Sequence, residues 1–177
     1  MNLDNLRNQS EYFEKVVQVN RVSKKTKGGD KRSLSVLVVS GDKRGRVGVG
    51  LGKASDVQSA VRKATTYAQR HMITVPLKDN HTIPHAIVLK HGAARVMLKP
   101  APVGTGIIAG GAVRVVVEAA GISDIVSKIL GTNNRASNVY ATLEALSRLK
   151  KINHEAEKPT EKEENKSKKK EKKDEAA

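Results

Sequence analysis

The densest group of chemically active side chains in this sequence is a basic cluster between two apolar segments. Residues 20–32, NRVSKKTKGGDKR, hold six Lys or Arg and a single Asp. Cations at this density, framed by apolar strands, are typical of a hairpin tip that inserts between phosphate backbones, although a solvated loop is the simpler alternative. The sequence therefore predicts contact with RNA or DNA through Arg21, Lys24, Lys25, Lys27, Lys31 and Arg32.

The net charge of the chain also favours a polyanionic partner. The 177 residues carry a formal charge of +15. Residues 1–70 hold 15 Lys or Arg against 6 Asp or Glu, residues 71–152 hold 10 against 4, and residues 153–177 hold eight of each. The excess charge thus lies on the apolar, foldable part, where phosphates would neutralise it. Further contacts with RNA are expected at Arg44, Arg46, Lys53, Arg62 and Lys63.

The scarcity of aromatic residues narrows the mode of binding. Only Tyr12, Phe13, Tyr67 and Tyr140 are present, which is 2% of the chain. Proteins that bind single strands usually stack bases on exposed rings. We therefore expect an electrostatic interaction with the backbone of structured RNA.

A glycine-rich strand, GRVGVGLGKAS at 45–55, resembles the phosphate loop of small-metabolite kinases. A P-loop would need Gly at the position of Val47, and Ala54 stands where Ser or Thr would bind Mg²⁺. Two interpretations stay open. Lys53 and the following helix N-terminus form an anion site, or the glycines let the strand pack closely against a neighbour. A kinase-like enzyme is the less favoured function, because the chain is short for a second substrate site.

A second glycine motif has the spacing of a dinucleotide fingerprint. Gly104, Gly106 and Ala109 fit GxGxxG/A, and Asp124 follows twenty residues after Gly104. The context argues against a dinucleotide, because prolines crowd the preceding residues and Gly110 interrupts the expected helix. A turn that contacts a protein or RNA is the favoured interpretation.

No catalytic residue, metal site or cofactor is expected. Cysteine is absent, which excludes thiolate metal sites and a thiol nucleophile. His81 and His85 have i, i+4 spacing, but Pro84 between them argues against a helix. Nothing marks a catalytic triad or a pair of carboxylates.

The order of secondary structure elements must position these residues. We expect strands at 11–22, 33–40 and 46–53, then a helix whose capping box is Ser55 and Gln58. After a connector come strands at 83–91 and 93–100 and a helix at 134–151, whereas 112–121 and 122–131 fit either type. The expected division is an arm at 1–10, an RNA-binding domain at 11–74, a linker at 75–82, an α/β domain at 83–152 and a disordered Lys/Glu-rich tail at 153–177. No targeting signal or membrane segment is recognised, so a cytoplasmic location is expected.

Two segments together resemble the bacterial-type small-subunit ribosomal protein S5 family. They are NRVSKKTKGGDKRSLSVLVVSGDKRGRVGVGLGKASDV and KPAPVGTGIIAGGAVRVVVEAAGISDIVSKILGTNN, and the resemblance covers roughly residues 10–150. It implies an α+β fold with two parts. The first is a three-stranded sheet plus a helix, similar to a double-stranded-RNA-binding domain. The second is an α/β sandwich with a four-stranded sheet and two helices.

The resemblance also implies a function and partners. It implies a structural, non-enzymatic component of the small ribosomal subunit that binds rRNA. Ser23 and Gly28 match the family's rRNA-binding hairpin, which lies near the spectinomycin site. Ribosomal proteins S4 and S8 and mRNA near its entry path are the implied neighbours, and the contact with S4 implies a role in translational accuracy. The implied protein interface is Gly104, Thr105, Gly106, Gly110 and Arg114. The alternative is a free double-stranded-RNA-binding or nucleic-acid-coating protein.

Overall fold

The computed structural model describes residues 12–150 as two sheets and three helices. The expected N-terminal arm and Lys/Glu-rich tail lie outside these residues. The first half of the described chain runs β1 (Phe13–Thr26), β2 (Gly29–Gly41), β3 (Arg46–Ala54), α2 (Val57–Arg70) and β4 (Ile73–Thr74). The strands form an antiparallel sheet in the order β1-β2-β3-β4, in which two-residue β4 is added to the three expected strands.

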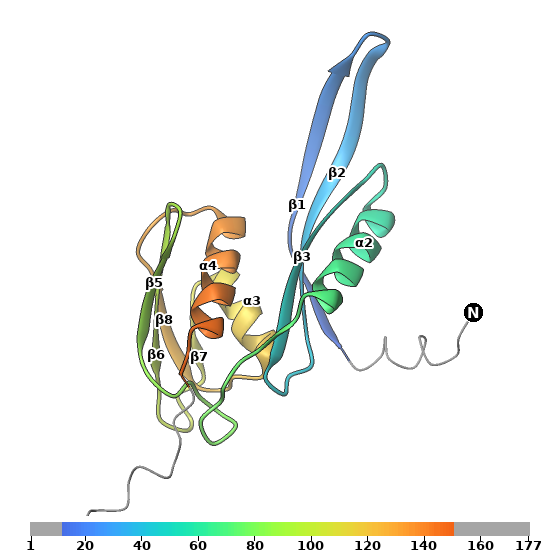
Figure 1. Cartoon of the computed structure of the whole chain (residues 1–177). Coiled ribbons are helices and arrows are strands. Elements are labelled where there is room, and N and C mark those ends of the chain that lie inside the picture. The colour runs from blue at the N-terminus through green and yellow to red at the C-terminus, as the bar shows by residue number, and fades with distance from the viewer. Residues whose placement is uncertain (1–11, 151–177) are drawn as a thin grey trace, which may run out of the picture.

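The first two strands extend well beyond the rest of their sheet. Pairing of β2 with β3 begins at Leu34, whereas β1 and β2 stay paired as far as Thr26 and Gly29. The expected hairpin is therefore confirmed, but the expected strands, 11–22 and 33–40, are too short. The basic tip is itself a two-stranded ribbon closed by a two-residue turn, and it projects away from the body of the molecule (Figure 1). Gly29 allows this tight closure because its φ of +121° is accessible mainly to glycine.

The glycine-rich strand β3 packs directly on helix α2. A Cβ atom at Gly48, Gly50 or Gly52 would collide with backbone atoms of the helix. On the same face of the sheet, Val36 and Val38 pack against Ala60 and Ala64. The close-packing interpretation of these glycines is therefore confirmed.

The N-terminal cap of α2 differs from the expected one. Asp56, not Ser55, is the N-cap, and its carboxylate accepts hydrogen bonds from the backbone N–H groups of Gln58 (3.0 Å) and Ser59 (3.3 Å). A carboxylate at a helix N-terminus also interacts favourably with the helix dipole, an advantage that the Ser hydroxyl lacks. The N-terminus of α2, one predicted anion site, is thus occupied by the carboxylate of Asp56.

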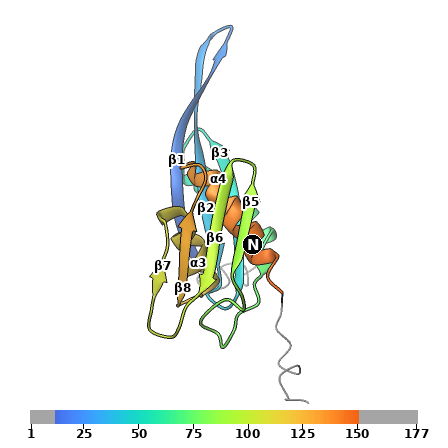
Figure 2. The same cartoon turned by 90° about the vertical axis from the view of Figure 1, so that its left-hand side faces the viewer.

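The second half of the described chain forms a four-stranded sheet with two helices on one face. Its elements are β5 (Ile87–His91), β6 (Ala94–Pro100), β7 (Ile107–Ile108), α3 (Gly111–Ala120), β8 (Ile125–Ile129) and α4 (Arg135–Ser147). The strand order is β5-β6-β8-β7, and β7 runs parallel to β8 because α3 connects them (Figure 2). The ambiguous segment at 112–121 is therefore helical, and Gly121 ends it with a φ of +84°. The α+β fold implied by the resemblance is confirmed.

Helices α3 and α4 lie between the two sheets, so the molecule has four layers ending in α2 (Figure 1). One core cluster includes Leu37, Val39 and Val49 of the first sheet together with Val116 of α3 and Leu146 of α4. Burying these side chains together stabilises the two halves as a single packed unit. None of the helices within residues 12–150 is long and apolar enough to cross a membrane.

The turn between β2 and β3 fastens the first sheet to the C-terminal end of α3. Backbone N–H groups of Lys43 and Gly45 donate to the carbonyl oxygens of Ala119 (3.1 Å) and Ala120 (2.9 Å). These are carbonyls that a helix end leaves without an intrahelical partner. Asp42 shapes the turn by accepting hydrogen bonds from the backbone N–H groups of Arg44 and Arg46.

The Asp42 carboxylate predicts a pH-dependent contribution to stability. Partial burial raises the pKa of Asp42, but hydrogen bonds from the Arg46 side chain and from both backbone N–H groups hold it below its ordinary value of 3.8. The stabilisation is therefore fully present above about pH 4 and is lost as the pH falls through the lowered pKa. We expect Asp42→Asn to lower the free energy of unfolding by about 1 kcal/mol at pH 7. Urea unfolding of both proteins at pH 7 and at successively lower pH checks this, because the difference should shrink once the pH falls below the lowered pKa of Asp42. A difference that stayed constant down to about pH 1, where carboxylates are protonated, would contradict it.

Candidate nucleic-acid interface

The basic ribbon, residues 21–33, presents cations on both of its faces. Because residues opposite each other in the register share a face, Lys24 and Lys31 lie together on one side. Arg21, Lys25 and Arg32 lie on the other side, where alternation along each strand places them. Lys27 and Gly28 form the turn at the tip, and Ser23 lies opposite Arg32 in the register.

The cations of the basic ribbon are exposed and lack an internal counter-charge. Among the ion pairs within residues 12–150, none involves a residue of the ribbon. Asp30 is the ribbon's single acidic residue, opposite Lys25, whereas Lys24 faces Lys31 directly. Like charges directly opposite each other destabilise a strand pair. An anionic partner on each face would relieve this repulsion, and phosphate backbones supply such anions.

The other cations expected to contact RNA lie at the base of the basic ribbon, on α2, and in the turn between β2 and β3. Lys53 lies beside the base of the basic ribbon, paired with Ser35. Arg62 and Lys63 are exposed on α2, as the sequence predicts from their position away from the apolar stripe. These residues could extend the ribbon's electrostatic surface along the first sheet and its helix.

Arg44 and Arg46 are not part of the ribbon surface. They belong to the turn at the opposite end of β2 and β3, where the chain docks on α3. The Arg46 guanidinium is bound to Asp42, with 2.7 Å between Nε and Oδ2. The structure therefore does not bring these two arginines together with the ribbon, and Arg46 already has a carboxylate partner.

The glycine motif before α3 is a braced turn. Gly104 and Gly106 have φ values of +90° and +73°, and the N–H of Gly106 donates to Asp124 Oδ1 (2.8 Å). Asp124 is 4% exposed. Since its carboxylate holds the turn from inside the protein, it is not available to a ribose, and the dinucleotide interpretation does not apply.

The residues expected at a protein interface gather at this turn. Thr105 donates from Oγ1 to the carbonyl of Pro102 (2.8 Å), and Arg114 donates from Nη2 to the carbonyl of Ile107 (3.0 Å). Gly104, Gly106 and Gly110 belong to the same segment, and Gly110 is the N-cap of α3. Next to them Val103 and Ile108 are 77% and 52% exposed. A surface that joins exposed apolar side chains to the edge strand β7 is suited to contact with another protein.

The histidines take part in separate local contacts. His71 stacks on Tyr67 with 4.1 Å between ring centroids, and His91 Nδ1 lies 2.7 Å from Glu144 Oε2. His85 Nε2 accepts a hydrogen bond from the backbone N–H of Lys150 (3.1 Å). In the part of the chain that the structure describes, no group of three His, Cys, Asp or Glu side chains could hold a metal ion.

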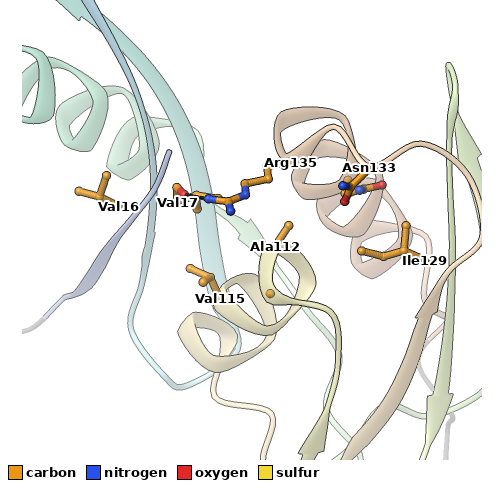
Figure 3. Close-up of a pocket in the computed structure, with 9 residues that line it drawn as sticks. Val16, Val17, Ala112, Val115, Ile129, Asn133 and Arg135 are labelled. Atoms are coloured by element: carbon orange, nitrogen blue, oxygen red, sulfur yellow. Dashed lines mark hydrogen bonds between the residues drawn. The ribbon is translucent and has the colours of Figure 1, made fainter. Parts of the chain in front are cut away.

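The sequence did not reveal a polar cleft beside the base of the basic ribbon. Arg135 at the start of α4 reaches toward β1, where its Nη1 lies 3.5 Å from the carbonyl oxygen of Val17 (Figure 3). Asn133 and Asn138 line the same cleft. These contacts join segments more than 110 residues apart, so no local sequence pattern could have indicated them.

An α+β fold of four layers that carries an exposed cationic ribbon is typical of a structural nucleic-acid-binding protein. Comparison with protein families agrees with this class. Residues 12–76 match the family described as "Ribosomal protein S5, N-terminal domain", and residues 89–159 match "Ribosomal protein S5, C-terminal domain".

Individual relatives extend this similarity over most of the chain. This chain is 53% identical over 140 residues to "Small ribosomal subunit protein uS5c" of Cyanophora paradoxa, and the aligned residues cover 79% of this chain and 83% of the relative. It is 51% identical over 146 residues to "Small ribosomal subunit protein uS5" of Chloroflexus aurantiacus, covering 82% of each. The chain therefore belongs to the ribosomal protein S5 family, as its motifs predict. It is a structural component of the ribosome and not an enzyme.

Proposed function

We propose that this protein holds rRNA of the small ribosomal subunit by placing the basic ribbon between phosphate backbones. The observation that carries the proposal is the two-faced distribution of cations, with Lys24 and Lys31 on one face and Arg21, Lys25 and Arg32 on the other. A two-stranded ribbon is narrow enough to lie between two backbones, because its strands are only about 5 Å apart. Lys53, Arg62 and Lys63 add contacts beside it.

Co-sedimentation tests the assignment to the small subunit. A tagged form of the full chain should co-purify with small subunits at moderate salt, and its absence from them would contradict the proposal. Free protein should lose RNA affinity steeply as salt rises, because each neutralised phosphate releases counterions. Cross-linking that recovered mainly duplex RNA or DNA outside ribosomes would favour a free nucleic-acid-coating protein instead.

The glycine turn at 104–110 and Arg114 form the proposed contact with ribosomal protein S4, through which the chain supports translational accuracy. The exposed side chains of Val103 and Ile108 support a protein contact here. Ribosomal protein S8 and mRNA near its entry path are the other proposed neighbours, in a cytoplasmic ribosome. We assign RNA binding to residues 11–74 and the protein contacts to residues 83–152, joined by a linker at 75–82.

A charge placed at Val103 should weaken the contact with S4. Val103→Asp is expected to fold normally, because the side chain is 77% exposed, but to lower the affinity for S4 roughly tenfold by desolvating a carboxylate at the interface. The measurements are capture of purified S4 and a misreading reporter in cells. Val88→Asp is the matched control, because Val88 is 50% exposed on β5 at the opposite edge of the same sheet. Equal losses from both variants would argue against this interface.

A further inference from the structure

A cavity of about 350 Å³ lies between the base of the basic ribbon and the N-terminal ends of α3 and α4 (Figure 3). Its walls are partly apolar and partly polar, and the apolar side chains include Val17 from β1, Val115 from α3 and Ile129 from β8. A second hollow, of about 530 Å³, shares Asn133 and Arg135 with it and reaches Asn20 on β1. The two hollows meet at Asn133 and Arg135, and the second lies nearer the ribbon, at Asn20 and Ser35. Apolar walls with a few polar groups are typical of small-molecule sites, and 350 Å³ is within their usual range of about 300–1,000 Å³.

One buried polar group at this cavity has no partner. Asn138 is 1% exposed, and its Nδ2 donates to the carbonyl of Thr132 (2.9 Å), which fixes the orientation of the amide. Its Oδ1 accepts no hydrogen bond from any residue in the range 12–150. Buried acceptors in folded proteins are almost always satisfied. Asn138 lines the cavity, so an N–H donor of a ligand that reached this oxygen would satisfy it.

The N-terminus of α3 offers donors at the same cavity. Its N-cap is Gly110, so no side chain caps the first N–H groups of this ten-residue helix. Gly111 and Ala112 line the cavity, and a Cβ added to Gly111 would meet only open space. Free N–H groups at a helix N-terminus bind anions such as phosphate.

Arg135 adds a positive charge at the mouth of the cleft. Its guanidinium contacts the carbonyl of Val17, and within the described residues no carboxylate forms an ion pair with it. The site thus combines an N–H acceptor, N–H donors, a cation and apolar walls. A nucleotide has the complementary parts: N–H groups and flat apolar faces on its base, and an anionic phosphate.

We propose that this cleft binds one unpaired nucleotide, with the base donating to Asn138 Oδ1 and the phosphate held by Arg135 and the N-terminus of α3. This inference rests on the proposed RNA-binding function and adds a site for an extruded base to the phosphate contacts of the ribbon. Because Arg135 lines both hollows, an RNA that lies on the ribbon and passes Asn20 would insert its nucleotide beside this arginine. The chemistry is the same for a nucleotide within RNA and for a free mononucleotide.

The test compares two RNA hairpins that differ by one bulged nucleotide, with the four bulge bases tried in turn. The full chain should bind at least one bulged hairpin about three- to tenfold more tightly than the unbulged one, which is the factor that one net hydrogen bond contributes. Gly111→Leu fills the cavity and should abolish this preference while leaving the affinity for the unbulged hairpin unchanged. Gly111→Ala is the matched control, because it gains similar helix propensity but adds only one methyl group.

Nuclear magnetic resonance of the same proteins locates the bound nucleotide. The Asn138 side-chain amide and the Gly111 backbone amide should shift on binding the bulged hairpin and not the unbulged one. Millimolar AMP, GMP, CMP or UMP that gave the same shifts would assign the cleft to free nucleotides as well, whereas shifts with RNA alone would restrict it to RNA. No preference for any bulge, or a preference that Gly111→Leu retains, would overturn the inference while leaving RNA binding by the ribbon intact. Failure to bind either hairpin would overturn the proposed function too.

Discussion

Alanine at both Lys24 and Lys25 is expected to lower the affinity of the full chain for small-subunit rRNA about 100-fold. The two side chains project from opposite faces of the basic ribbon, so their removal takes one phosphate contact from each side. A hydrogen bond to a charged group contributes roughly 1.5–3 kcal/mol, or about tenfold or more for each lysine. The slope of log affinity against log salt should fall by about two, since two fewer phosphates are neutralised.

The control variant has the same net charge as the Lys24 and Lys25 variant, but its two substitutions lie on the second sheet. Lys90→Ala with Lys128→Ala removes two exposed cations from β5 and β8, far along the chain from the ribbon. We expect this control to change RNA affinity only slightly. Filter binding over a range of salt, small-subunit assembly and the response to spectinomycin are the measurements. Similar losses from both pairs would mean that overall charge, and not the ribbon, governs binding.

The fold of the ribbon should survive the Lys24 and Lys25 substitutions. Both side chains are exposed and form no ion pair within the described residues. Removing Lys24 also relieves its repulsion with Lys31. A circular dichroism spectrum and thermal midpoint equal to those of the parent protein would therefore separate lost RNA contacts from lost structure.

Periodicity predicted most of the elements because each has one buried face. The alternation of Val47 and Val49 with glycine indicates a strand, and the spacing of Ala60, Ala64 and Ala68 predicts the buried stripe of α2. The extension of β1 and β2 into the basic ribbon could not be predicted in this way. Both faces of the ribbon are solvated, so its strands lack the apolar alternation that identifies a strand.

The candidate sites differ in the same way: a cluster of neighbouring residues could be predicted from the sequence, whereas a site built by tertiary contacts could not. The cations of the ribbon are close in sequence, so their clustering was evident before the fold was known. Arg46 was assigned to RNA on charge alone, but the fold pairs it with Asp42. The cleft at Arg135 and Asn138 escaped notice because it depends on α4 packing beside β1. A tertiary contact of this kind leaves no local signal in the sequence.

The buried glycines of β3 form a contact that tolerates no side chain, because the backbones of β3 and α2 touch there directly. At Gly50 a Cβ atom would overlap the carbonyl oxygen of Ala64 and lie 2.9 Å from the backbone nitrogen of Ala68. No flexible side chain is available to move aside, so β3 and α2 would have to separate along their length. Separation would also expose Val36 and Val38, whose burial depends on the same contact.

Gly50→Ala should therefore lower the free energy of unfolding by about 3 kcal/mol, at the upper end of the usual cost of overpacking. For a chain of this size the thermal midpoint should fall by roughly 10 °C. Gly28→Ala is the control, because its Cβ would meet only open space at the tip of the ribbon and should leave the midpoint unchanged. Thermal and urea unfolding followed by circular dichroism give both values. If Gly50→Ala unfolded at the parent's midpoint, the direct packing of α2 on the glycine strand would be wrong, and with it the placement of Arg62 and Lys63 beside the RNA-binding sheet.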